Sequence, residues 1–226
     1  MFLKICGIRN EAEARAAVDC GATALGFLVG LTHRAEDGVD EHKARAIVQS
    51  LPRGIESVMV THLLDAGAIA GLADAIGVRA VQVQDDLPVE QMRHLGLLLP
   101  GRRLIKAVHV TGPEAIRHAQ AHRGVAQALL LDSRTPERLG GTGRTHDWSI
   151  SRTIVQSVAP LPLYLAGGLR PGNVEAAIRA VRPAGVDVNS GVETADGAKD
   201  PSAMRAFLGK ATVALSALRD EGAGIP

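Results

Sequence analysis

Aromatic side chains are scarce in this chain of 226 residues, where they account for 2% of the composition and Trp148 is the only tryptophan. So few aromatics provide no row of stacking platforms for single-stranded nucleic acid. Acidic and basic residues nearly balance, 24 against 25, and the net charge of +1 gives no broad field for nucleic acid or an anionic membrane. These shortages argue against a nucleic-acid partner.

Cysteines are also few, and the sequence shows neither a long apolar run nor a targeting pattern. Two cysteines, Cys6 and Cys20, cannot form a disulfide framework, which fits a reducing compartment. No run of about 18 apolar residues is present to span a bilayer, and the amino terminus has no signal-peptide pattern. We therefore expect a soluble, cytoplasmic protein without a membrane partner, whose 46% hydrophobic content can build a substantial core.

What the chain does have is a regular alternation of short apolar runs and helical patterns. Two helix starts carry a capping signal: Asn10 with Glu13 resembles a capping box, and Asp200 precedes a proline at the first helical position. The runs predict strands at 2–6, 23–29, 56–61, 79–84, 103–109, 126–132, 162–166 and 184–189. The segments between them predict helices near 11–20, 40–50, 65–76, 88–98, 113–121, 147–158, 171–181 and 200–218.

Eight strands alternating with eight helices predict an α/β fold with parallel strands joined by helical crossovers. Runs such as 129–131 are too continuously apolar for a sheet with one face in water. An open doubly wound sheet and a closed barrel both fit this pattern. The count of eight, the even spacing and the absence of Gly-x-Gly-x-x-Gly after the first strand favour the barrel. We predict a (β/α)8 TIM barrel as a single domain over residues 1–218, with a frayed tail at 219–226.

In such a barrel the active site is built at the carboxyl ends of the strands, so polar residues there are candidates. Cys6 ends the first run, and Asp132 ends a run of three leucines. A lone cysteine is more often a small buried hydrophobe than a base, whereas a carboxylate on an apolar strand needs a reason. The alternatives for Asp132 are a helix cap or an ion pair with Arg134. His62 and His109 also lie near strand ends and rank below these two.

Glycines at the ends of the seventh and eighth strands indicate a phosphate site. Gly167 and Gly168 follow one strand, and Ser190 and Gly191 follow the next. Paired glycines let backbone N–H groups approach an anion, and these two strand ends form the recurrent phosphate site of the fold. Tight turns without a ligand are the alternative interpretation.

The loop at 139–145 is long enough to fold over a substrate, and three glycines make it adaptable. Gly141 and Gly143 are its candidate substrate contacts, although a plain flexible connection explains the loop equally well. No group of His, Cys and Asp residues has metal-ligand spacing, so no metal is expected.

Several short motifs follow one another along the chain: Lys4-Ile5-Cys6-Gly7-Ile8, Gly26-Phe27, Leu130-Leu131-Asp132, 140–148, 166–169, Asn173-Val174, 186–193 and 197–200. Each is weak alone, but the ordered set resembles the phosphoribosylanthranilate isomerase family over nearly the whole chain. The resemblance implies a cofactor-free TIM barrel of tryptophan biosynthesis. Its reaction would be an Amadori rearrangement, an aldose–ketose isomerisation of N-(5'-phosphoribosyl)anthranilate to 1-(2-carboxyphenylamino)-1-deoxyribulose 5-phosphate.

Carried over by motif, the resemblance implies roles for individual residues. Cys6 would be the general base that takes the C2′ proton, and Asp132 the general acid that protonates the furanose oxygen. At neutral pH this chemistry needs a raised pKa for Asp132, and a thiol whose pKa is lowered or which works as a minor thiolate fraction. Arg34 lines up with an arginine that meets the anthranilate carboxylate. The remaining substrate contacts would be Gln82, Gly141 and Gly143, and the phosphate contacts Gly167, Gly168, Ser190 and Gly191.

Three stretches depart from the family pattern. The fourth strand is usually followed by Gln-Leu-His-Gly and the third by Phe-Val-Asn, where this chain has Gln82-Val83-Gln84-Asp85 and Val60-Thr61-His62. Acidic residues at 36–37 also follow Arg34. All three are expected where the mouth meets the aglycone, which leaves the catalytic and phosphate halves intact.

Three functions therefore stay open at this stage. The first is the isomerase itself, acting on a small phosphosugar as a monomer or homodimer. The second is a paralogue that acts on another phosphorylated pentose derivative, and the third is a non-catalytic phosphosugar-binding barrel. The presence of both Cys6 and Asp132 weighs against the third.

Overall fold

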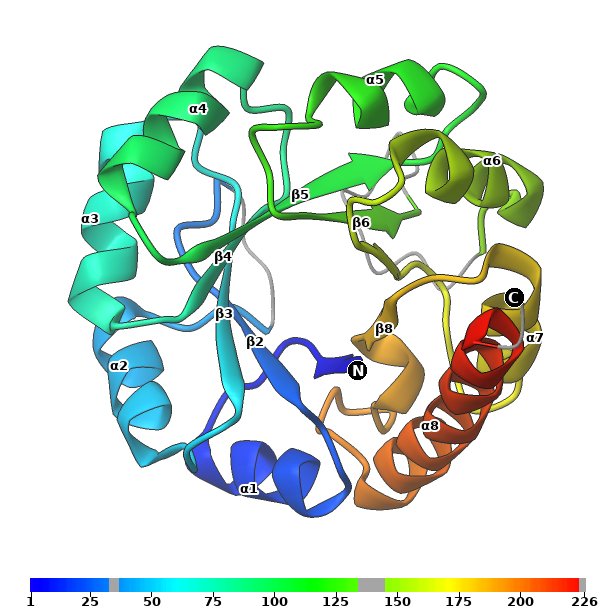
Figure 1. The fold of residues 1–226 in the computed structure, drawn as a ribbon. Helices are drawn as coiled ribbons and strands as arrows, with labels where there is room; N and C mark the ends of the chain where they lie inside the picture. The colour runs from blue at the N-terminus through cyan, green and yellow to red at the C-terminus, as the bar shows by residue number, and fades with distance from the viewer. Residues whose placement is uncertain (33–36, 134–144, 224–226) are drawn as a thin grey trace.

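The computed structural model describes residues 1–32, 37–133 and 145–223, and within them the chain forms a closed barrel of eight parallel strands. The strands follow one another around the barrel in sequence order, and β8 pairs with β1 to close the sheet. Helices form a ring outside the strands (Figure 1). The predicted (β/α)8 TIM barrel is confirmed.

Each expected strand and helix is present, and most ends differ from the prediction by a few residues. The strands are β1 (Phe2–Ile5), β2 (Ala24–Leu28), β3 (Glu56–Thr61), β4 (Ala80–Val83), β5 (Arg103–His109), β6 (Ala128–Asp132), β7 (Leu163–Leu165) and β8 (Gly185–Val188). The helices are α1 (Glu11–Asp19), α2 (Glu41–Ser50), α3 (Ala66–Ile76), α4 (Val89–Leu98), α5 (Ala115–Ala121), α6 (Trp148–Val158), α7 (Val174–Val181) and α8 (Pro201–Ala223). A short 3-10 helix that the sequence did not predict, η1 (Ser190–Val192), follows β8.

Side-chain caps begin α1 and α8 as the sequence predicts. Asn10 accepts a hydrogen bond from the backbone N–H of Glu13 at 2.8 Å, and Asp200 accepts one from Ser202 at 2.8 Å. The Glu13 carboxylate bonds the backbone N–H of Arg9 instead of closing the box onto Asn10. At its other end α8 continues to Ala223, so the boundary expected between 218 and 219 lies inside this helix.

Alternation along the strands separates two apolar regions. The larger core lies between the sheet and the helices and includes Ile5 and Leu131. A smaller cluster, with Phe2 and Leu130, fills the barrel interior. Both faces of the sheet are therefore covered, which explains why the strands are so continuously apolar. Among the residues that the structure describes, no helix combines the length and apolar character needed to cross a membrane.

Candidate active site

Asp132 ends β6, where its carboxylate is held from two sides. Gln84 donates from Nε2 to Oδ2 at 2.9 Å, and the backbone N–H of Ser133 donates to Oδ1 at 2.8 Å. Burial raises the pKa of Asp132 to about 6, although both hydrogen bonds act to lower it. A carboxyl group with this pKa carries a useful proton fraction near neutral pH, which a general acid needs.

Two glutamine amides form a chain behind this carboxylate. Gln82 donates from Nε2 to Oε1 of Gln84 at 2.8 Å, and Gln84 in turn donates to Asp132. Gln82 Oε1 is buried and has no hydrogen-bond partner among the described residues. The sequence placed the change at Gln84 on the aglycone side of the mouth. That placement was incomplete, because the amide bonds the candidate acid directly.

The changed ends of β3 and β4 contact each other. His62 Nδ1 lies 3.0 Å from Asp85 Oδ2, and the ring of His109 donates from Nε2 to the carbonyl of Gln84 at 3.0 Å. His62 and His109 therefore hold the turn after β4, on which Gln84 sits. Two departures that look separate in the sequence form one polar group in the fold.

Cys6 follows β1 and is 6% exposed. Burial raises the pKa of its thiol to about 11, and the ammonium of Lys4 acts in the opposite direction. The thiolate that a general base requires is therefore a minor form in the unliganded protein. Its position at the strand end agrees with the sequence prediction, while its environment is less favourable to the thiolate than a reactive cysteine usually has.

Directly beneath Cys6 lies an ion pair to which the sequence prediction assigned no role. Lys4 Nζ lies 2.8 Å from Asp187 Oδ2, and β1 and β8 pair these two residues in register. The signal was present in the sequence, because one lysine and one aspartate interrupt otherwise apolar strands. Their pairing could not be predicted, since 183 positions separate them.

The two glycine-containing loops expected to bind phosphate lie against each other. Gly167 and Gly168 have φ of +81° and +64°, a region that side chains disfavour. A Cβ on Gly191 would overlap the carbonyl oxygen of Leu169, so the loop after β8 packs directly on the loop after β7. Ser190 is exposed and begins η1. The structure thus brings together all four predicted phosphate residues.

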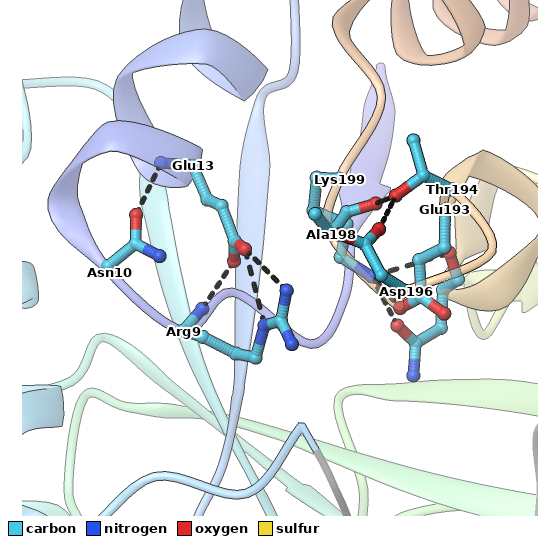
Figure 2. Close-up of polar contacts among 9 residues, drawn as sticks. Arg9, Asn10, Glu13, Glu193, Thr194, Asp196, Ala198 and Lys199 are labelled. Atoms are coloured by element: carbon cyan, nitrogen blue, oxygen red, sulfur yellow. Dashed lines mark hydrogen bonds and ion pairs between the residues drawn. The ribbon is translucent and has the colours of Figure 1, made fainter.

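A polar network joins the loop after β8 to the segment after β2. Lys199 donates to Glu193 and to Asn189 Oδ1, both at 2.5 Å, and Asn189 Nδ2 donates to Asp37 at 2.7 Å. Figure 2 shows Lys199 and Glu193 beside Thr194 and Asp196, with the Arg9–Glu13 pair facing this loop. The acidic residue expected to crowd the aglycone, Asp37, therefore has an amide partner.

Three predicted site residues lie outside the part of the chain that the structure describes: Arg34, Gly141 and Gly143. Arg134, the alternative partner of Asp132, lies outside it too. Over residues 1–32, 37–133 and 145–223, no group of His, Cys, Asp and Glu side chains could hold a metal ion.

A barrel whose mouth combines a carboxyl of raised pKa, a thiol and two adjoining glycine turns has the make-up of a TIM-barrel proton-transfer enzyme. Comparison with known proteins names the family. Residues 3–210 match the model of N-(5'phosphoribosyl)anthranilate (PRA) isomerase. A relative from Methanosarcina mazei, N-(5'-phosphoribosyl)anthranilate isomerase 2, is 41% identical over 213 residues, which cover 93% of this chain and 94% of the relative.

Solved structures agree with the sequence comparison. The phosphoribosyl anthranilate isomerase of Thermotoga maritima has a TM-score of 0.84 at 34% identity, covering 94% of this chain and 99% of that one. A complex of such an isomerase with reduced 1-(O-carboxyphenylamino)-1-deoxyribulose 5-phosphate has a TM-score of 0.81 at 31% identity, with the same coverage. The chain belongs to the phosphoribosylanthranilate isomerase family, as its motifs predict, and is an isomerase of tryptophan biosynthesis.

Proposed function

We propose that Cys6 and Asp132 perform the Amadori rearrangement of N-(5'-phosphoribosyl)anthranilate as general base and general acid. The observation that carries this proposal is the placement of Asp132. Its carboxyl stands at the barrel mouth, held by Gln84 and Ser133, with a pKa of about 6. A neutral carboxyl group is the donor that opening of a furanose ring requires near neutral pH.

The reaction divides into two proton transfers. Asp132 donates a proton to the furanose oxygen, and the ring opens as the nitrogen lone pair forms a protonated imine, C=N⁺H. The Cys6 thiolate then removes the C2′ proton, which gives an enolamine that tautomerises to the ketose. After these steps Asp132 is ionised and Cys6 is a thiol, so the two groups exchange protonation states during turnover.

Phosphate supplies remote binding energy that places the ribose between the two groups. The adjoining turns at Gly167, Gly168, Ser190 and Gly191 support this role, since they lie side by side and two of them need positive φ. Contacts of Arg34, Gln82, Gly141 and Gly143 with the substrate stay predictions. For Gln82, the bond to Gln84 supports an indirect contribution through Asp132.

The site departures do not favour a different substrate. Asp37 is bonded to Asn189, and His62 lies against Asp85, so these charged or polar groups have partners within the protein. A carboxylate already engaged by an amide donor repels the anthranilate carboxylate less than a free one would. The family substrate is therefore preferred over another phosphorylated pentose.

The test is the loss of anthranilate-type fluorescence when purified protein meets freshly made phosphoribosylanthranilate. Cys6→Ser and Asp132→Asn should each lower kcat by about 10²–10⁴-fold, the contribution of a positioned acid or base. Affinity for a product analogue should change far less, because phosphate and aglycone contacts stay in place.

Cys20→Ser is the matched control, since Cys20 caps the end of α1 and its thiol donates a hydrogen bond to the carbonyl of Pro201. It should keep normal turnover. Near-normal turnover in Cys6→Ser or Asp132→Asn would remove the proposed role of that residue. No turnover by the unaltered protein, with phosphate-dependent binding of other ribose phosphates, would favour the paralogue.

We further propose that the enzyme works in the cytoplasm on its small phosphosugar alone, as a monomer or homodimer. Sedimentation of the purified protein separates the two assembly states. The near-zero net charge supports the absence of a nucleic-acid partner.

A further inference from the structure

A fully buried ion pair lies inside the barrel, below the thiol and the acid. Lys4 is 0% exposed and Asp187 is 5% exposed, with 2.8 Å between Nζ and Oδ2. The second oxygen of Asp187 is buried without a hydrogen-bond partner among the described residues. Such a pair contributes little net stability, because desolvating two charges offsets their attraction and an unpartnered oxygen adds a further penalty. Stability alone does not account for it.

The ammonium and the thiol occupy the same small space. Lys4 and Cys6 stand two residues apart at the end of β1 and so point to the same side of the sheet. A Cβ built on Gly26 of the neighbouring β2 would lie 2.7 Å from Cys6 Sγ and 3.0 Å from Lys4 Nζ. Both groups therefore converge above Gly26, where any side chain would displace one of them.

The pair acts on the two catalytic groups in opposite directions. At Cys6, the nearby Lys4 ammonium lowers the thiol pKa more than Asp187 raises it, against the larger effect of burial. At Asp132, where burial again dominates, Asp187 raises the carboxyl pKa more than Lys4 lowers it. The other groups that face these sites are Asp37, which raises the pKa of Cys6, and Gln84 and Ser133, which lower that of Asp132.

We propose that the Lys4–Asp187 ion pair positions the catalytic proton, favouring the form in which Asp132 carries it and Cys6 is a thiolate. The proposal rests on the acid and base roles given above. Lys4 and Asp187 touch neither reacting atom in this scheme and are positioning residues. The ammonium stays charged in the barrel, because Asp187 and, to a lesser extent, Cys6 together raise the pKa of Lys4 although burial, the largest single effect, acts to lower it. No proton leaves the pair during turnover.

The experiment removes both charges together, because removing one would leave the other buried and unpaired. In a Cys20→Ser background, Lys4→Gln/Asp187→Asn keeps a neutral hydrogen-bonded pair, and Lys4→Met/Asp187→Leu replaces it with an apolar one. Alkylation of Cys6 by iodoacetamide at pH 8 should become about tenfold slower, since one pKa unit changes the thiolate fraction tenfold. The value of kcat/KM should fall by at least about tenfold with KM nearly unchanged.

Lys106→Met is the matched control. It removes a second buried lysine of the same barrel, which lies on β5. The ammonium of Lys106 donates to the carbonyl of Ala107, and Lys106 is not among the groups that act on the pKa of Cys6. This variant should leave both the alkylation rate and kcat/KM unchanged. A merely loosened barrel would expose Cys6 and speed its alkylation, which is the opposite of the expected result.

An unchanged alkylation rate in both double variants would overturn the proposal, and so would slower alkylation with unchanged kcat/KM. Failure of the proposed function is separate. Cys6→Ser with near-normal turnover would remove the base role and leave the alkylation result for Lys4 and Asp187 intact.

Discussion

Asp132 and Cys6 hold their protons in the opposite order from the one that an acid and a base require. The carboxyl has a pKa of about 6 and the thiol one of about 11, both raised by burial. Between these values the resting protein carries a carboxylate and a thiol. Catalysis uses the minor form in which the proton has moved from Cys6 to Asp132.

The pH profile follows from this order. The value of kcat/KM should rise with pH to about 6 and then stay level to at least pH 9, because each loss of protonated Asp132 is matched by a gain of Cys6 thiolate. Gln84→Met removes a donor to the carboxylate, so its rising limb should move upward by up to about one pH unit. The fluorescence assay over pH 5–9 measures both.

The substrate phosphate also titrates near pH 6 and could produce a rising limb of kcat/KM. A limb set by the phosphate would not move in Gln84→Met. An unmoved limb in Gln84→Met would show that the phosphate sets the profile. A decline beginning at pH 7–8 in the unaltered protein would contradict the order of the two pKa values.

At the scale of the single strand, two buried lysines of this barrel have quite different surroundings. On β1, Lys4 faces the interior and has a carboxylate partner in Asp187. On β5, Lys106 is also buried, but its ammonium donates a hydrogen bond to the backbone carbonyl of Ala107. Burial lowers the pKa of Lys106 to about 8, although Asp86 and Asp85 act to raise it. An ammonium held in this way opposes folding.

Lys106→Met should therefore raise the free energy of unfolding at pH 7 by roughly 1–3 kcal/mol. The pKa in the folded state, about 8, lies below the value of 10.5 expected when unfolded. Stability of the unaltered protein consequently rises between about pH 8 and 10.5, and the gain from methionine shrinks over the same range. Urea unfolding at pH 7 and pH 10 measures this. Exposed Lys43→Met should change stability by less than about 0.5 kcal/mol.

At the scale of the whole molecule, the active site depends on contacts that run around the barrel mouth. Asn189 after β8 connects Lys199 with Asp37 in the segment after β2, and both Asn189 and Asp37 lie against Gly7, the residue after Cys6. Gln84 similarly connects β4 with β6. Loops distant in sequence are thus held as one rim, which keeps the phosphate turns and the aglycone side in a fixed relation.

Asn189→Ala should weaken this rim. Loss of one or two hydrogen bonds, at about 0.5–1.5 kcal/mol each, predicts a KM raised by roughly 3–10-fold with a smaller fall in kcat. Steady-state kinetics with phosphoribosylanthranilate measures the split. Ser50→Ala, at the end of α2, removes a hydroxyl bonded to Ile47 and should change neither constant. An unchanged KM in Asn189→Ala would show that the loops hold their positions without it.

The sequence predicted the backbone elements more completely than it predicted the surroundings of the side chains. Apolar periodicity was sufficient for the order of strands and helices, and strand ends identified Cys6 and Asp132 as candidates. The glycines at 167–168 and 191 were also located correctly at two adjoining turns. By contrast, the prediction missed the end of α8 and the short helix η1. No local signal in the sequence marks either boundary strongly enough: helix propensity continues past the predicted end of α8, and η1 lies in a turn that contains a glycine.

The sequence by itself determined the barrel, its family and the identity of the proposed acid and base, because these depend on local patterns and on motifs in order. Only the tertiary structure decided what surrounds Cys6 and Asp132. Closing the barrel brings β8 against β1, which pairs Lys4 with Asp187, and it brings the end of β4 within reach of β6, so that Gln84 bonds Asp132. Proton affinities depend on such neighbours in space, and no local pattern encodes them.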